Sequence, residues 1–192
     1  MNPAFALALL LPSLAIAAVQ APTPQTWPID PAQSQAQFSV RKFWFAHESG
    51  TFPQLHGTLR RIDTHIGADL VEVDANLDVA ELLMDDPGHR AHALGPNFFD
   101  AAHYPRIRFD SDPFPLSALT TGGIVHGMLT LHGERHPVAL KLQPSDCPRQ
   151  PLACVIRARG TIARSIFGMR GWRGVLSDKV ELDLRISLDD RP

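Results

Sequence analysis

The sequence carries almost no net charge and lacks the short motifs of the common enzyme classes. Its 18 basic and 20 acidic residues leave a formal net charge of −2, which argues against a strong electrostatic interface with nucleic acid. It contains no G-x-S-x-G or H-E-x-x-H motif and no glycine-rich phosphate loop. The sequence therefore predicts a protein that is not an enzyme, has no catalytic residues and binds no nucleic acid.

Long hydrophobic runs are confined to the N-terminus. Residues 1–18 read MNPAFALALLLPSLAIAA, and 14 of these 18 residues are hydrophobic. The run is short for a membrane span and ends in Ala15-Ile16-Ala17, which fits the A-x-A pattern of a signal cleavage site. We expect residues 1–18 to be a cleaved signal peptide and residues 19–192 to be a periplasmic or secreted domain without stable membrane insertion. An uncleaved N-terminal anchor is the alternative.

Cysteine is scarce as well, with only Cys147 and Cys154 in the chain. In an exported protein, an even number of cysteines at short range favours a disulfide bond that closes a loop. The alternative is two free thiols. Because no C-x-x-C motif is present, we expect the bond to have a structural and not a redox role.

Windows with the helical period are few, and apolar residues alternate with a period of two instead. The alternation is clearest in residues 69–80 and 177–189. It recurs more weakly in residues 35–45, 55–59, 106–110, 124–132, 138–142 and 156–162. About eight strands, each with one apolar face, predict an all-β fold in the form of a single extended eight-stranded antiparallel β-barrel. Two packed sheets are the alternative.

One segment departs from the strand pattern. A short helical segment is expected around residues 85–102, with Asp86-Pro87 at its start and Gly95-Pro96 as a stop signal.

Several residues on the predicted inner face of the barrel are small. They include Val71, Val73, Ala75, Gly127, Ala158 and Gly160. Small inward side chains leave volume inside an eight-stranded barrel, and volume lined by apolar atoms binds apolar ligands. A barrel whose interior is simply packed is the alternative.

Three longer stretches resemble the motifs of one known family. They are HALGPNFFDAAHYPRIRFDSDPF (92–114), GMLTLHGERHPVAL (127–140) and RSIFGMRGW (164–172), and WPIDPAQSQAQFSV (27–40) matches the opening strands. Together they resemble the YceI family of secreted or periplasmic, lipocalin-like proteins over Trp27 to Leu188. The resemblance implies an extended lipocalin-like barrel that holds a long apolar chain, such as a polyisoprenoid or an isoprenoid quinone. It implies no metal, cofactor or reaction.

The chain departs from the family pattern at four positions. Gln33 and Lys42 stand where the family often has His, and Asn97 and Ile166 stand where it often has Asp. The last two changes remove two carboxylates from the expected mouth of the cavity.

The candidate binding site has an apolar part and a polar part. Arg90, His92 and Arg164 are expected to form a polar mouth that contacts the head group of a ligand. The residues expected to line the apolar cavity are Phe38, Val40, Trp44, Phe98, Phe99, Ile107, Phe109, Leu129, Phe167, Met169 and Trp172. The expected partner is a long-chain isoprenoid or a similar amphiphilic lipid. The sequence also leaves a homodimer as an alternative to a monomer. An enzyme that modifies a lipid or quinone is the less favoured alternative.

The histidines give only a weak metal signal. His89 and His92 form an H-x-x-H pair that places two imidazoles on one helical face, as zinc requires. No third ligand follows at a fixed motif distance, and we therefore predict no metal site.

Overall fold

The computed structural model describes residues 25–43, 46–62 and 69–189 of the chain. The predicted signal peptide, residues 1–18, lies outside these ranges. The strands of the described residues are β1 (Thr26–Pro28), β2 (Gln35–Lys42), β3 (Ala46–Phe52), β4 (His56–Ile62), β5 (Leu70–Asp78), β6 (Arg106–Ser111), β7 (Phe114–Pro115), β8 (Gly123–Leu131), β9 (Glu134–Leu142), β10 (Ile156–Ala163) and β11 (Leu176–Ile186).

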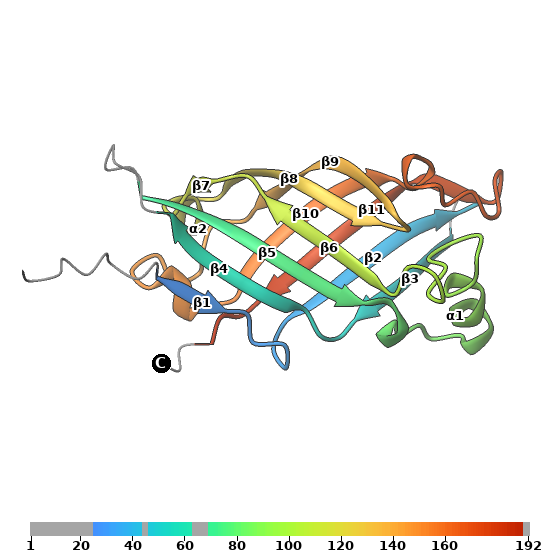
Figure 1. Ribbon diagram of the computed structural model, residues 1–192, viewed down its shortest axis with the longest axis horizontal. Helices are drawn as coiled ribbons and strands as arrows, with labels where there is room; N and C mark the ends of the chain where they lie inside the picture. Colours follow the sequence, from blue (N-terminus) through green and yellow to red (C-terminus); the bar gives the residue numbers. More distant parts are fainter. Residues whose placement is uncertain (1–24, 44–45, 63–68, 190–192) are drawn as a thin grey trace, which may run out of the picture.

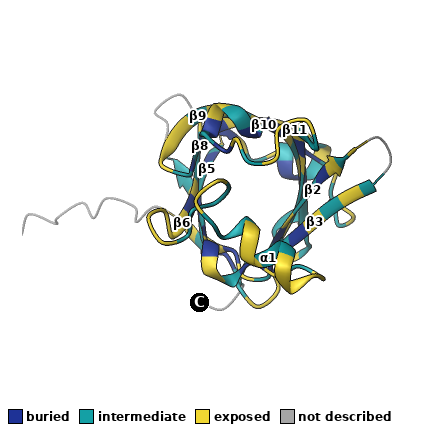
Figure 2. Ribbon diagram, turned by 90° about the vertical axis from the view of Figure 1, so that its right-hand side faces the viewer, coloured by how far each residue is buried: buried dark blue, intermediate teal, exposed yellow. Residues whose placement is uncertain are grey.

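All paired strands are antiparallel and belong to one curled sheet, as the sequence predicted (Figure 1). The order of strands across the sheet is β1-β4-β5-β6-β8-β9-β10-β11-β2-β3, with β7 paired to β5. Viewed along its length, the sheet wraps around a central axis (Figure 2). The predicted all-β, barrel-like fold is confirmed.

The two edges of the sheet meet along a seam. Within the described residues, no continuous ladder of hydrogen bonds joins edge strand β1 to edge strand β3. Isolated bridges close the seam instead, one between Ile29 and Leu188 and another between Thr51 and Leu83. The barrel is therefore curled but not closed by a continuous ladder.

The eight expected strands correspond to β2, β4, β5, β6, β8, β9, β10 and β11, and three further strands were missed. Two of these, β1 and β7, are only three and two residues long. The third, β3, has little apolar periodicity because Ala46, Glu48 and Gly50 precede Phe52 on its inner face. Gly50 is required there, since an added Cβ would lie 2.6 Å from the ring of Phe38.

A short helical region covers the end of the barrel shown on the right of Figure 1. It consists of the 3₁₀ turn η1 (Val79–Glu81) and helix α1 (Pro87–Ala93). Asp86 caps α1 by accepting a hydrogen bond from the backbone N–H of His89 at 2.8 Å, and this bond lowers the pKa of its carboxyl group. The helix is shorter than the expected range of residues 85–102, because the chain turns back after Leu94.

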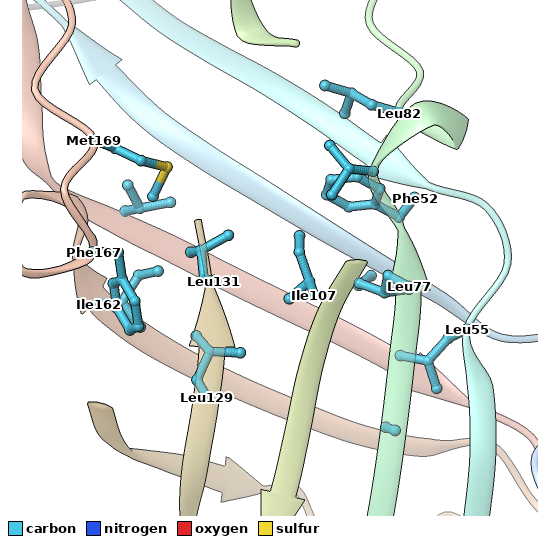
Figure 3. Packing of buried hydrophobic residues seen from close by; sticks show 14 of the residues in the cluster. Phe52, Leu55, Leu77, Leu82, Ile107, Leu129, Leu131, Ile162, Phe167 and Met169 are labelled. Carbon is cyan, nitrogen blue, oxygen red and sulfur yellow. The ribbon is translucent and has the colours of Figure 1, made fainter. Parts of the chain in front are cut away.

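The inner faces of the strands form the core. One cluster of buried side chains lies towards the α1 end and includes Phe52, Leu77 and Leu131 (Figure 3). A second cluster, around Phe114 and Leu119, includes residues of β7 and of the short helix α2 (Ala118–Thr121). Both clusters occupy the barrel interior, because the pleat directs alternate side chains of each strand inward.

The predicted disulfide bond between Cys147 and Cys154 is present. It closes the loop that carries the 3₁₀ turn η2 (Pro151–Ala153) between β9 and β10. Just before the disulfide-closed loop, the backbone N–H of Ser145 donates a hydrogen bond to the carbonyl oxygen of Thr120 in α2 at 3.0 Å. The described part of the chain contains no helix that is long and apolar enough to cross a membrane.

We expect replacement of both cysteines, C147A/C154A, to lower the free energy of unfolding by about 2–3 kcal/mol, because the bond restricts the unfolded chain over a short loop. Urea unfolding of the wild type and the variant measures the difference. The wild type in reductant should match the variant, and unchanged stability in both would contradict a stabilising bond.

Candidate functional site, an apolar cavity inside the barrel

A cavity of about 220 Å³ lies inside the barrel. Of the 41 residues that line it, 35 are apolar, and the six others are Gln37, Glu48, Asn76, His89, His92 and Arg164. Its lining includes members of both buried clusters, from Phe52 near the α1 end to Leu119 of α2. The cavity is therefore continuous along the barrel and almost entirely apolar.

The cavity is long and narrow. Strand β11 and the residues after it contribute a lining residue at every second position from Val180 to Leu188. These eight steps correspond to about 27 Å of strand, or about 20 Å along the axis of a barrel whose strands are tilted by about 40°. That length exceeds the ~15 Å occupied by half of the ~30 Å hydrocarbon core of a bilayer. The shape suits an extended chain better than a compact ring.

Alanine side chains account for part of the open space. Ala36, Ala75 and Ala158 lie on the cavity wall, as predicted for the last two. The prediction that Gly127 and Gly160 also open space is wrong. A Cβ on Gly127 would lie 2.7 Å from the ring of Phe109, and one on Gly160 would lie 2.6 Å from Leu140. These glycines make room for neighbouring side chains.

Three phenylalanines form an aromatic wall near the α1 end of the cavity. The ring of Phe99, which follows α1, packs edge-on against Phe52 and Phe38 with centroid distances of 5.6 and 5.7 Å. Phe38 and Phe52 are 6.2 Å apart. The segment after α1 is therefore anchored to the barrel through the cavity wall, by contacts of the kind that stabilise aromatic pairs.

Trp172 forms part of the mouth of the cavity. Its ring lies 5.5 Å from that of His92 and 6.4 Å from that of His89, both on α1. Lys42 at the end of β2 lies over the same ring at 5.8 Å. Trp172 is 39% exposed, so one side chain contacts both the cavity and the solvent.

A small ionic network lies beside Trp172. Glu48 of β3 binds Lys42 through one carboxylate oxygen at 2.9 Å and the Nδ1 atom of His89 through the other at 3.0 Å. These contacts connect β2, β3 and α1 at the mouth. Sequence reasoning did not select Glu48, because β3 lacks the apolar period that would have placed this residue on an inner face.

Arg164 lies inside the wall and is only 5% exposed. Its guanidinium group donates hydrogen bonds to four backbone carbonyl oxygens, those of Met169, Gly171, Leu176 and Ser177, at 2.7–3.3 Å. Burial lowers the pKa of this group. Arg164 therefore holds the loop between β10 and β11 in place and does not project from the mouth as expected.

The other two predicted mouth residues differ from each other. Arg90 donates hydrogen bonds to the carbonyl oxygens of Leu82 at 2.6 Å and Ala80 at 2.8 Å, does not line the cavity, and joins α1 to η1. His92 is exposed, lines the cavity and contacts the carbonyl oxygen of Gly88 through Nδ1 at 2.7 Å. Of the three predicted mouth residues, His92 and Arg164 line the cavity, and only His92 is also exposed.

Most of the predicted apolar residues lie on the cavity wall. Phe167 is fully buried but does not line the cavity; its ring lies 5.2 Å from that of His136. Trp44 lies outside the described residues. Those that do line the cavity are Phe38, Val40, Phe98, Phe99, Ile107, Phe109, Leu129, Met169 and Trp172.

Further wall residues could have been inferred from the same pattern. Leu182 and Leu184 line the cavity and belong to the strongest alternation in the sequence. They are only partly buried although they point into the barrel, because the cavity lies in front of them.

The H-x-x-H pair does not gather a third ligand. The described residues contain no group of three or more His, Cys, Asp or Glu side chains placed to hold a metal ion. His89 contacts the carboxylate of Glu48, and His92 contacts the carbonyl group of Gly88.

Comparison with known proteins identifies a relationship over most of the chain. The sequence model of the YceI-like domain matches residues 27–188. Burkholderia cenocepacia BcnA shares 20% identity, with a TM-score of 0.61 over 82% of this chain and 98% of that chain. A polyisoprenoid binding domain from Saccharophagus degradans shares 18% identity, with a TM-score of 0.61 over 83% and 95%.

A third structure, the YCEI protein of Campylobacter jejuni, shares 16% identity, with a TM-score of 0.57 over 79% of this chain and 90% of that chain. No curated protein matches the sequence. At these identities the structural matches establish a shared fold.

We expect Arg164→Met to lower the free energy of unfolding by about 2–4 kcal/mol, because it leaves several buried carbonyl groups without donors. The matched control is Arg159→Met. Arg159 is exposed and paired with Asp183 at 2.8 Å, so its loss should cost less than about 1 kcal/mol. Urea unfolding measures both variants, and equal losses would contradict the structural role of Arg164.

Proposed function

The chain belongs to the YceI-like domain family, and from this membership and its cavity we propose that it is an exported binding protein for a long-chain isoprenoid lipid. A polyprenol, a polyprenyl phosphate and an isoprenoid quinone all fit this description. The protein would serve transport, storage or stress protection. The observation that carries the proposal is the continuous apolar cavity along the barrel.

The energetics of the cavity favour a long apolar chain. Each methylene group moved from water into such a wall contributes about 0.8 kcal/mol, and a chain in the cavity places many of them there. The Saccharophagus degradans relative is a polyisoprenoid binding domain, which supports the same class of ligand for this chain. A barrel with a packed interior fits the open volume less well.

The polar groups suggest how the ligand is oriented. His92 and Trp172 lie at the α1 end of the cavity, beside the network of Lys42, Glu48 and His89. The residues around Phe114 and Leu119 are apolar and end the cavity on the other side. We therefore place the head group at the α1 end and the tail towards α2.

Binding, and not catalysis, is the activity that the lining supports. The polar mouth residues Glu48 and His89 contact each other, and Arg164 donates to backbone carbonyl groups. These contacts position wall segments. The proposed function needs only burial of the ligand.

Export is supported by two independent features. Residues 1–18 have the pattern of a secretory signal, and the Cys147–Cys154 disulfide bond suits an oxidising compartment. Both agree with a carrier that works outside the cytoplasm.

Mass spectrometry of an organic extract tests the proposal directly. We expect the purified mature protein to release a prenyl lipid of long chain, or to take up an added polyprenol or isoprenoid quinone when it is purified empty. No lipid in the extract, together with no uptake of either probe, would overturn the proposal.

A ring placed inside the cavity should compete with the ligand. We expect Ala75→Phe to weaken polyprenol binding at least about tenfold, because loss of contact with two methylene groups already costs about 1.6 kcal/mol. Native mass spectrometry or tryptophan quenching measures the affinity.

The matched control is Ala139→Phe, which adds the same ring on the exposed face of β9, away from the cavity. Circular dichroism checks that both variants are folded. Equal affinities in the two folded variants would place the ligand elsewhere.

A further inference from the structure

The loop between η3 (Arg164–Phe167) and β11 stands out at the mouth of the cavity. Its sequence from residue 168 to residue 175 is GMRGWRGV, which contains two basic residues and no acidic one. Arg170, Trp172 and Arg173 are exposed, and a Cβ added to Gly174 would meet no atom within 4 Å. Trp172 adopts a φ of 51°, which side chains rarely adopt and which the hydrogen bonds of Arg164 help to hold.

A second aromatic residue joins this loop. The backbone N–H of Phe43, directly after β2, donates a hydrogen bond to the carbonyl oxygen of Val175 at 2.7 Å. Phe43 is 53% exposed, and its side chain does not line the cavity. We call the exposed residues Arg41, Phe43, Arg170, Trp172 and Arg173 the mouth rim.

The arginines of the mouth rim differ from those on the barrel wall. On the wall, several arginine side chains pair with carboxylates across neighbouring strands, as in Arg159–Asp183 and Arg60–Glu72. Within the described residues, Arg41, Arg170 and Arg173 form no ion pair.

The acidic groups near the rim are already engaged. Glu48 binds Lys42 and His89, and Asp178 accepts hydrogen bonds from the backbone and hydroxyl groups of Ser165 at 2.9 and 2.8 Å. Within the part of the chain that the structure describes, neither carboxylate forms an ion pair with a rim arginine, so the rim guanidinium groups can contact a partner.

We propose that the mouth rim docks on the surface of an anionic lipid bilayer. Exposed aromatic side chains flanked by arginine match the interface of a membrane, where tryptophan rings lie at the level of the head groups and basic residues contact anionic lipids. Trp172 also lines the cavity, so docking brings the opening of the cavity to the bilayer. A lipid then passes between membrane and barrel without crossing water. The surface goes beyond the proposed function and holds for any membrane-derived ligand.

Flotation with vesicles tests the proposal. The mature protein should bind vesicles that contain phosphatidylglycerol more strongly than vesicles of phosphatidylcholine alone, and added salt should weaken the binding. We expect R170Q/R173Q to weaken binding about 25-fold, because each arginine near an anionic surface contributes about fivefold. Neither side chain lines the cavity, so uptake of polyprenol from solution should be unchanged.

Two matched controls test whether the loss of vesicle binding comes from the rim itself or from the loss of any exposed positive charge or apolar side chain. R149Q/R185Q removes two exposed arginines away from the rim and should change vesicle binding less than twofold. Phe43→Ser should weaken vesicle binding about tenfold, because burial of a phenylalanine side chain contributes on the order of that factor. Ile124→Ser changes an equally exposed residue of β8 and should leave vesicle binding unchanged.

Each outcome has a distinct meaning. Equal losses in rim and control variants, or no vesicle binding by a protein that takes up polyprenol, would overturn the docking surface and leave the proposed function standing. Vesicle binding without lipid uptake would overturn the proposed function and leave the docking surface standing. Self-association that R170Q/R173Q abolishes, without vesicle binding, would assign the rim to a second copy of the chain and overturn the proposal.

Discussion

The two-residue period of the strands is the constraint on which the rest of this structure depends. Each strand directs every second side chain into the barrel interior. The register between neighbouring strands aligns these inward side chains into rows that run across the sheet. One such row runs from Gly160 through Leu182 and Phe38 to Gly50. Its two large residues, Leu182 and Phe38, are neighbours and lie between two glycines, so each large side chain lies beside a glycine. A shift of one residue in any ladder would turn that strand's apolar face outward.

The wall of this barrel is apolar along its length, but its interior is not filled. Inward leucines such as Leu182 and Leu184 contact open volume, and a group of three phenylalanines, Phe38, Phe52 and Phe99, lies at the α1 end. Among the described residues, Arg164 is the only charged side chain that is deeply buried, and it donates to backbone carbonyl groups of the loop that carries Trp172. The polar interactions therefore shape the opening, while the long apolar section lines open volume.

The sequence was most informative where the apolar period was strong. It located eight of the strands and the face that each turns inward, because alternation reports the pleat directly. The sequence pattern missed β3, because Glu48 and Gly50 on its inner face break the apolar alternation. Gly50 makes room for the ring of Phe38, which belongs to another strand, and a pattern within β3 cannot report this contact. The roles of Arg90 and Arg164 could not be predicted, since a charged residue in a motif does not reveal whether its donors meet solvent or carbonyl groups. The prediction for Gly127 and Gly160 was wrong for a related reason, because side chains of neighbouring residues fill the space beside these glycines.

The seam between the edges of the sheet leaves part of the barrel's circumference without a ladder of hydrogen bonds among the described residues. A barrel closed by an unbroken ladder has a circumference set by its hydrogen bonds. Within the described residues, this one is joined along the seam by the Ile29–Leu188 and Thr51–Leu83 bridges and by packed side chains. Side-chain contacts yield over small distances at less cost than a ladder of hydrogen bonds. A carrier with such a seam, as proposed above, would accommodate chains of differing thickness and branching, and the length of the cavity, more than its width, would set its selectivity.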